Sequence, residues 1–187
     1  GSKDSFALII CSTGHNKQEL ENIRSYAQSH TSCKLLRAAN TSLGILLLLN
    51  HAIKSLELLG HEEFDFEIFE AHHRMKEDSP SGTAKLLATE LAKHSDLKVV
   101  TNRSEKRETG QIGVTAIRGG HVFGEHQIHI LGEHEELVLT HKARSRTLFA
   151  RGALKLAIWI AHQRPGYYEF GDIKAEELAK LANANSN

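Results

Sequence analysis

A strand, a helix and a second strand follow one another at the start of the chain, and this order constrains the fold more than any other feature. Phe6–Cys11 is a continuous apolar run of the kind that forms a strand buried on both faces. Asn16 is a suitable N-cap for a polar helix over Lys17–His30, and Cys33–Ala38 is a second apolar run. Because a strand–helix–strand unit places its two strands side by side in one direction, we expect a parallel sheet.

The middle of the chain predicts a second, mixed sheet with flanking helices. Leu43–Leu59 is apolar at nearly every helical position, whereas Phe64–Phe69 alternates with the period of a half-buried strand. Ser81 is a suitable N-cap for a helix from Gly82 to about His94. Residues 102–110 are polar and are expected to form a mobile loop.

Three further strands and two helices are predicted in the second half of the chain. Glycine-containing links of hairpin length predict that the three strands are antiparallel neighbours. The strands are expected at Gln111–Arg118, His121–Leu131 and Glu135–His141, and the helices at Arg146–His162 and, after an Asp172 cap, at Ile173–Ala182. The predicted fold class is therefore α/β, with an α+β middle region built on a mixed sheet.

Composition excludes two broad classes of function. The chain has 23 Lys and Arg against 23 Asp and Glu, whereas nucleic-acid and membrane-surface proteins usually carry a basic excess. No stretch approaches the ~20 apolar residues of a membrane span. Cys11 and Cys33 lie in or beside apolar runs, so we expect buried free thiols and a cytoplasmic protein with no nucleic-acid or membrane partner.

The densest group of titratable residues is the segment EAHHRMKEDSPSGTA, which follows the strand predicted at Phe64–Phe69. At a strand's end His72, His73, Arg74 and Lys76 can converge on one point, where a histidine can exchange a proton and a lysine can stabilise negative charge. The sequence Pro-Ser-Gly-Thr then opens a helix whose free N–H groups bind anions. The segment therefore fits a small substrate with two negative charges.

Two other interpretations of this segment stay open at this point. The run could be a solvated loop in which Ser81 is only a structural cap, and imidazole is also a common zinc ligand. Adjacent histidines of an extended segment point to opposite sides, however, and the sequence has no His-Glu-x-x-His motif or closely spaced cysteine pair. We therefore predict no metal site.

The same segment, Glu70–Ala84, strongly resembles the dihydrodipicolinate reductase family of bacterial lysine and diaminopimelate synthesis. The family signature is Glu-x-His-His-x-x-Lys-x-Asp-x-Pro-Ser-Gly-Thr-Ala, and every fixed position is matched here. Further stretches agree in order: CSTGH (Cys11–His15), AANTSLG (Ala38–Gly44), RGGHVFGEH (Arg118–His126), THKARSRTLFARGAL (Thr140–Leu154) and RPGYYEFGD (Arg164–Asp172). The resemblance implies reduction of 4-hydroxy-tetrahydrodipicolinate, a cyclic dicarboxylate, by NADPH or NADH.

The resemblance also implies roles for individual residues. His72 would be the general acid that protonates the substrate, and Lys76 would stabilise charge on it. The residues implied to bind the substrate are His73, Ser81, Gly82 and Thr83. The residues implied to touch the nicotinamide end of the cofactor are Cys11, Ser12, Thr13, Ala38, Ala39, Asn40 and Thr41. The family resemblance further implies a homotetramer that assembles through the sheet of the substrate-binding domain.

One departure from the family concerns the cofactor domain. The chain has no Gly-x-x-Gly-x-x-Gly fingerprint, so we expect a piece of a longer protein that binds NAD(P)H poorly by itself. On this interpretation residues 1–41 are the remnant of a Rossmann-like dinucleotide-binding domain, 42–146 the substrate-binding and oligomerisation domain, and 147–187 the return to the first domain. Two alternatives are a metal-dependent hydrolase using His72, His73, His126 and His129, and a non-catalytic remnant that only oligomerises.

Overall fold

The computed structural model describes residues 5–12 and 14–177 and divides the chain into two compact units. Unit 1 contains Gly1–Leu46 and Thr147–Asn187, and unit 2 contains Leu47–Arg146. Thr13 of the expected cofactor set and the end of the helix expected at Ile173–Ala182 lie outside the described residues. None of the described helices is long and apolar enough to cross a bilayer.

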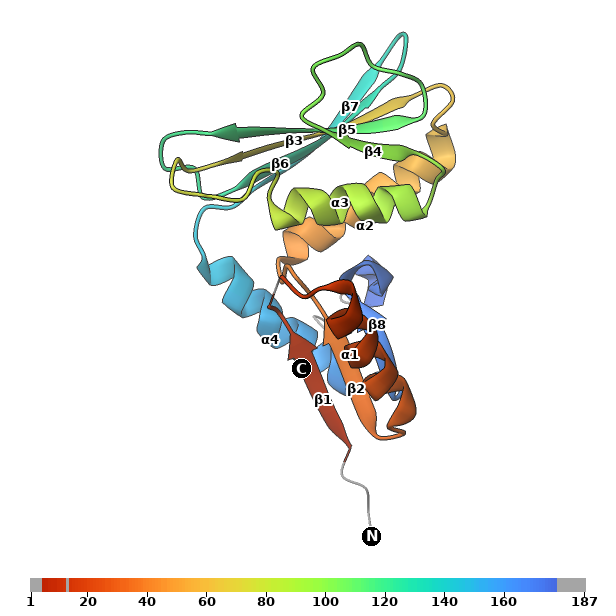
Figure 1. Cartoon of the computed structure of the whole chain (residues 1–187), viewed down its shortest axis with the longest axis vertical. Helices are drawn as coiled ribbons and strands as arrows, with labels where there is room; N and C mark the ends of the chain where they lie inside the picture. The colour runs from red at the N-terminus through yellow and green to blue at the C-terminus, as the bar shows by residue number, and fades with distance from the viewer. Residues whose placement is uncertain (1–4, 13, 178–187) are drawn as a thin grey trace. The chain divides into compact units, whose positions relative to one another are not determined.

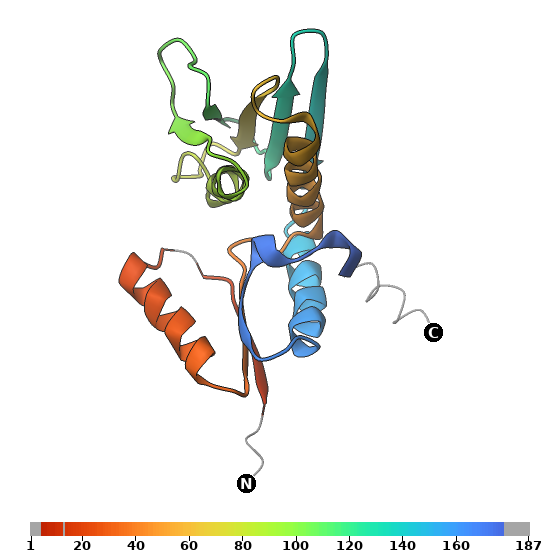
Figure 2. The same ribbon diagram turned by 90° about the vertical axis from the view of Figure 1, so that its right-hand side faces the viewer.

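Unit 1 is built on a three-stranded parallel sheet in the order β1-β2-β8. Figure 2 shows helices α1 and α4 on opposite faces of this sheet. Asn16 caps α1 through a reciprocal pair of hydrogen bonds with Glu19, so the predicted strand–helix–strand unit is confirmed. The elements are β1 (Phe6–Ile10), α1 (Lys17–Ser29), β2 (Cys33–Arg37), α4 (Thr147–Ala161), β8 (Gly166–Glu169) and the 3₁₀ turn η1 (Phe170–Asp172).

Three expectations for unit 1 were wrong in detail. Strand β1 is not buried on both faces, because it is an edge strand and α1 packs over β2 and β8 instead; Phe6 is 41% and Leu8 45% exposed. Cys33 is buried as expected, but Cys11 is exposed because it follows the last residue of that edge strand. Asp172 closes η1 instead of capping the predicted last helix, whose start is described at residues 175–177 after the extended backbone of Ile173. Strand β8 had no sequence signal.

Unit 2 is built on a five-stranded mixed sheet in the order β4-β5-β3-β6-β7 (Figure 1). Strands β4 and β5 run parallel to β3, whereas β6 pairs with β3 and β7 in antiparallel fashion. Figure 1 shows α2 and α3 against the same face of the sheet. The elements are α2 (Leu43–Leu59), whose first residues up to Leu46 belong to unit 1, β3 (Asp65–His72), α3 (Gly82–Lys93), β4 (Lys98–Thr101), β5 (Gln111–Arg118), β6 (Glu125–Leu131) and β7 (Glu136–Lys142).

The mixed sheet and the hairpin between β6 and β7 confirm the sequence analysis, but the expected hairpin between β5 and β6 was wrong. Strand β3 lies between these two strands and pairs with both of them. The glycine link Gly119-Gly120 therefore spans a neighbouring strand instead of making a tight turn. Strand β4 was not anticipated, because its four residues fall inside a stretch without a clear period.

The core of unit 2 lies between the sheet and its two helices. Alternate residues of β3, β5 and β6 point to this side, and each buried Ile, Leu or Phe side chain contributes about 1.5–3 kcal/mol to the stability of the folded state. Fully buried examples are Phe66, Ile68, Leu87, Leu91, Ile112, Ile128 and Ile130. The apolar row of β3 then continues into two polar side chains, Glu70 and His72, which are also buried.

The opposite face of the sheet has no helix over it within the described residues, and it carries polar and partly exposed side chains. Glu67 of β3 lies on this face and accepts hydrogen bonds from Arg103 at 2.9 Å and Arg107 at 3.1 Å. These two arginines belong to the loop predicted at 102–110, and their ion pairs tie that loop to the sheet. Ile117 and Val138 are among the exposed apolar residues of the face.

Candidate functional site

The candidate site of unit 2 lies where β3 ends, β6 begins and α3 begins. The register of the sheet pairs Glu70 with His126 and His72 with Arg118 across the neighbouring strands. Because side chains of a strand alternate between its faces, Glu70 and His72 both point to the helix side, toward the start of α3. Four polar side chains from three strands therefore meet at one edge of the core.

Glu70 is the centre of this group and its side chain is fully buried. Its carboxylate accepts two hydrogen bonds from the Arg118 guanidinium, at 2.7 and 2.9 Å, and one from the Ser81 backbone N–H at 3.0 Å. The His72 imidazole lies 2.5 Å away through Nδ1. Burial by itself would raise the pKa of Glu70, but the hydrogen bonds from His72, Arg118 and Ser81 outweigh it and hold the pKa at about 2. Glu70 is thus ionised near neutral pH.

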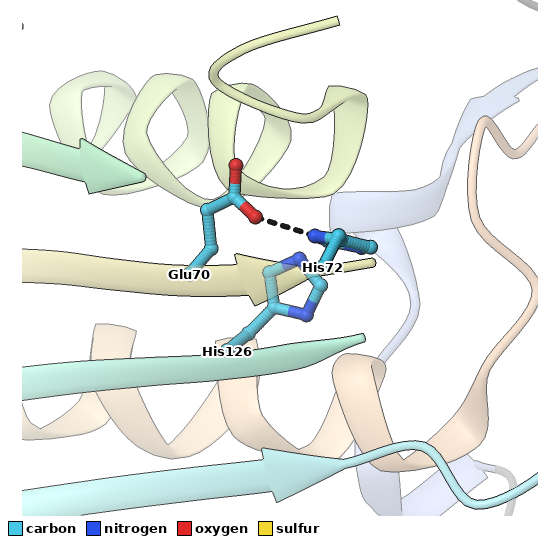
Figure 3. A group of neighbouring side chains, drawn as sticks. All are labelled: Glu70, His72 and His126. Carbon is cyan, nitrogen blue, oxygen red and sulfur yellow. Dashed lines mark hydrogen bonds and ion pairs between the residues drawn. The ribbon is translucent and has the colours of Figure 1, made fainter. Parts of the chain in front are cut away.

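His72 is 8% exposed and is oriented by its neighbours on two sides. Nδ1 faces Glu70, as Figure 3 shows, and the ring meets His126 edge to face at 5.2 Å between centroids. Nε2 lies next to Gly124, where a Cβ atom would come within 3.0 Å of it. Gly124 has a φ of +153°, a conformation that also favours glycine, so both the space and the backbone call for glycine here.

His126 links this group to the first turn of α3. Its Nε2 lies 3.2 Å from Ser81 Oγ, and the same oxygen accepts the Ala84 N–H, which caps the helix. Burial, assisted by the neighbouring His72, lowers the pKa of His126 to about 3. His126 is therefore neutral near pH 7.

The start of α3 is the place where the sequence predicts an anion seat. The predicted N-cap, Ser81, is confirmed, and an added Cβ at Gly82 would meet no other atom, so the space beside this first turn is open. In the present structure the Asp78 carboxylate accepts the Gly82 N–H at 3.3 Å and the Lys76 ammonium at 2.6 Å. The hydrogen bond and the charge of Lys76 lower the pKa of Asp78. Thr83 follows in the same turn and is partly buried.

The other expected members of the cluster are His73, Arg74 and Lys76. His73 donates its backbone N–H to the Val122 carbonyl at 2.7 Å, and its Nδ1 is buried with no hydrogen-bond partner among the described residues. Arg74 is exposed. Lys76 is half-buried and engaged with Asp78, as described above. Lys76 is therefore tied to the start of α3 through Asp78, whereas His73 is tied to the backbone of Val122.

The residues expected to touch a nicotinamide cofactor lie in unit 1, after strands β1 and β2. The Ala38 N–H bonds the Ile10 carbonyl at 2.9 Å, which joins the two strand ends. Ser12 and Cys11 are exposed there, whereas Asn40 and Thr41 are buried. Ligands of parallel sheets bind beyond the carboxyl ends of the strands, so the position fits a dinucleotide.

Two of these side chains already have hydrogen-bond partners within the chain. Ala39, which precedes them in the sequence, is half-buried. Asn40 accepts the Ser42 N–H at 2.7 Å, and the Thr41 hydroxyl donates to the Phe149 carbonyl at 2.8 Å. A Cβ on Gly152 of α4 would overlap the Thr41 carbonyl oxygen, so glycine is required for this close approach. Backbone and exposed groups, more than the Asn40 and Thr41 side chains, are thus available to a cofactor.

Sequence reasoning missed the roles of four residues in the site. Arg118 and Gly124 received no role, and His126 was considered as a site residue only in the metal-dependent hydrolase alternative. Glu70 was noted only as part of the motif. The alternation of β3 could have revealed Glu70, because it continues the buried row of Phe66 and Ile68. Strand pairing, which brings Arg118 and His126 to Glu70, has no such signal in the sequence.

The group Glu70, His72 and His126 also has the composition of a metal site, with ligand atoms within 4.8 Å of one another. Both carboxylate oxygens of Glu70, however, accept hydrogen bonds from the Arg118 guanidinium. A metal ion bound by Glu70 would have to displace this cation or remain next to it, which Coulomb repulsion disfavours strongly in a buried setting. The donor set therefore suits a carboxylate–histidine pair better than a cation.

Comparisons with known proteins agree on one family. The family model described as "Dihydrodipicolinate reductase, C-terminus" matches residues 44–173. A 4-hydroxy-tetrahydrodipicolinate reductase of Brucella abortus (strain 2308) is 41% identical over 172 residues, which cover 88% of this chain and 63% of that protein. The enzyme of the same name from Aquifex aeolicus (strain VF5) is 41% identical over 170 residues, with coverages of 89% and 63%. The chain thus spans less than two thirds of the length of these curated relatives.

A solved structure shares the fold. The dipicolinate-bound dihydrodipicolinate reductase from Paenisporosarcina sp. TG-14 superposes with a TM-score of 0.70 at 23% identity. The match covers 90% of this chain and 64% of that one. At this identity the superposition speaks for the fold alone.

Proposed function

The chain belongs to the dihydrodipicolinate reductase family, and we propose that it carries the substrate site of an enzyme that reduces 4-hydroxy-tetrahydrodipicolinate with NADPH or NADH. This reaction would serve lysine and diaminopimelate biosynthesis in the cytoplasm. The observation that carries the proposal is the buried Glu70–His72 pair beside the open first turn of α3. An acid–base group and an anion seat in one place suit a substrate that is both protonated and negatively charged.

The start of α3 would hold a carboxylate of the substrate. Backbone N–H groups of Gly82 and Thr83 lie in the first turn, where the helix dipole favours an anion. Lys76 is close enough to this turn to share Asp78 with Gly82, so its ammonium can neutralise a bound carboxylate. Ser81 would act through the shape of the turn, since its hydroxyl is occupied by Ala84 and His126. His73 would contact the substrate from the following loop.

His72 would donate the proton that the reduction requires. Its Nδ1 is held by Glu70, so Nε2 is the ring atom that can exchange a proton with the substrate. His126 stays neutral because burial lowers its pKa to about 3. Lys76 would stabilise the negative charge of the reacting substrate.

The nicotinamide cofactor would supply a hydride when bound. On the side of this chain, exposed groups of Cys11 and Ser12 and the backbone after β2 from Ala38 to Thr41 would support its nicotinamide end. The Thr41 side chain would contribute only indirectly, through its hydrogen bond to Phe149. The Gly-x-x-Gly-x-x-Gly fingerprint is absent from this sequence, so we expect weak binding of the dinucleotide to this chain by itself.

The helix-free face of the unit 2 sheet would form the contact between subunits of a homotetramer. Ile117 is 50% and Val138 41% exposed on this face, and both come from long strands of the sheet. Exposed apolar residues on a regular sheet are more typical of an interface than of a free surface. Sedimentation equilibrium of the chain would test this assembly, and a monomer at micromolar concentration would count against it.

The substrate site can be tested by calorimetric titration with pyridine-2,6-dicarboxylate, a planar analogue of the cyclic substrate. We expect binding to the wild type, and a loss of roughly tenfold or more in affinity for Lys76→Ala, since removing a charged partner costs about 1.5–3 kcal/mol. Lys85→Ala is the matched control, because Lys85 is an exposed lysine of α3, the helix whose start would hold the carboxylate. No binding to the wild type, or equal losses in both variants, would contradict the proposed site.

A further inference from the structure

We infer that Glu70 is a positioning residue that keeps His72 in the tautomer protonated on Nδ1 and so reserves Nε2 for proton transfer to the substrate. The inference rests on the proposed function, in which His72 is the proton donor. Glu70 acts through His72 and is not itself placed against the reacting atoms.

The contacts of Glu70 determine which group carries the proton between Glu70 and His72. Three hydrogen bonds from the Arg118 guanidinium and the Ser81 N–H converge on the two carboxylate oxygens. An arginine keeps all of its protons in proteins, so these contacts are satisfied only by a carboxylate that accepts. The 2.5 Å contact with His72 Nδ1 then requires the imidazole to be the donor.

This assignment reverses the tautomer that a free imidazole prefers, which is protonated on Nε2. With Nδ1–H directed at Glu70, a neutral His72 has its lone pair on Nε2, and a charged His72 has its transferable proton there. When the Nε2 proton moves to the substrate, the Nδ1 proton stays between His72 and Glu70. The missing side chain of Gly124 keeps the region next to Nε2 free, since a Cβ would lie 3.0 Å away.

Arg118 fixes the carboxylate against rotation and connects it with the rest of the site. The guanidinium holds both oxygens of Glu70 and also donates to the Asp78 carbonyl at 2.6 Å. Asp78 in turn accepts from Lys76. The proton donor and the cation proposed for the substrate are therefore oriented by one connected set of hydrogen bonds, and such a set is positioned more precisely than isolated side chains.

Replacing Glu70 by glutamine separates a positioning role from a purely structural one. Each carboxylate oxygen of Glu70 faces two donors: Oε1 faces Arg118 Nη2 and the Ser81 N–H, and Oε2 faces Arg118 Nη1 and His72 Nδ1. Of these four donors only the imidazole can become an acceptor, so the glutamine oxygen would take the Oε1 position and its NH₂ group would face His72. An NH₂ group needs an acceptor, so Nδ1 would lose its proton and the His72 tautomer would switch to Nε2–H. A glutamine that only filled space would leave the tautomer as it is.

The test is a nitrogen-15 NMR measurement on the 187-residue chain at a pH where His72 is neutral. Long-range proton–nitrogen correlations distinguish protonated from bare ring nitrogens, and the His72 signals are those missing from His72→Gln. We expect protonated Nδ1 and bare Nε2 in the wild type and the reverse in Glu70→Gln. Glu67→Gln is the matched control. Glu67 also lies in β3 and is also paired with arginines, but its side chain faces the other side of the sheet.

A bare Nδ1 in the wild type would overturn the inference without any variant, so it stays testable even where Glu70→Gln fails to fold. An unchanged tautomer in folded Glu70→Gln, or the same switch in Glu67→Gln, would overturn it too.

Titration of pyridine-2,6-dicarboxylate into the same samples tests the proposed function separately from the role of Glu70. A positioning role predicts that Glu70→Gln keeps its affinity within roughly tenfold of wild type. A larger loss would instead assign Glu70 a structural role, whereas a wild type that binds nothing refutes the proposed function alone.

Discussion

Acid should weaken unit 2 through Glu70, and the size of the effect follows from the contacts of this residue. Its pKa is about 2 in the folded chain against a reference value of 4.5, because hydrogen bonds from His72, Arg118 and Ser81 outweigh its burial. Since the folded pKa is the lower one, the stabilisation is complete above about pH 4.5 and is lost as pH falls toward 2. A shift of this size corresponds to about 3 kcal/mol, of which about 2 kcal/mol is lost by about pH 3.

The variant Glu70→Gln isolates this contribution. Glutamine does not titrate, so the free energy of unfolding of unit 2 should fall less with acid in the variant than in the wild type. Between about pH 6 and 3 the fall should be smaller by about 2 kcal/mol. At neutral pH the variant should be less stable, because Arg118 loses its buried ionic partner. The two stability curves therefore converge as the pH falls.

Urea unfolding followed by pulsed amide exchange of peptides from β3, β5 and β6 measures the stability of unit 2 specifically. Trp159 lies in unit 1, so its fluorescence reports on the other unit in the same samples and serves as an internal control. Equal pH slopes for wild type and Glu70→Gln in the unit 2 peptides would refute the assignment of a strongly held carboxylate.

Three further predictions concern the same site. Gly124→Ala should lower the affinity for pyridine-2,6-dicarboxylate in calorimetry, because φ is +153° and the new Cβ would lie 3.0 Å from His72 Nε2; unchanged affinity would contradict the close packing. Asp78→Asn should raise that affinity several-fold, since the Asp78 carboxylate accepts the Gly82 N–H that a substrate carboxylate would use; a weaker complex would show that Asp78 organises the seat instead. His126→Gln should make the free energy of unfolding of unit 2 fall less between about pH 6.5 and 3 in the same exchange assay. Burial lowers the pKa of His126 to about 3 in the folded chain, so protonation in acid favours the unfolded chain of the wild type. An unaltered pH slope would argue against a buried neutral imidazole.

Local sequence determined where two helices begin and which side chains of one strand share a face. The capping group at Asn16 and the N-cap at Ser81 fixed where α1 and α3 begin, because each side chain satisfies a backbone N–H three residues away. The alternation after Phe64 fixed which side chains of β3 share a face. The motif from Glu70 to Ala84 identified the family before any contact was known.

Tertiary structure decided what depends on the choice of strand partners. The link between β5 and β6 has the length of a hairpin, and only the insertion of β3 between these strands separates them. That insertion places Arg118 on one side of β3 and His126 on the other, each opposite a polar residue of β3. A period of two specifies the buried face of a strand but carries no information about its neighbours. The sequence therefore determined that a histidine and a helix start would meet, whereas only strand pairing supplied the buried ion pair that orients the histidine.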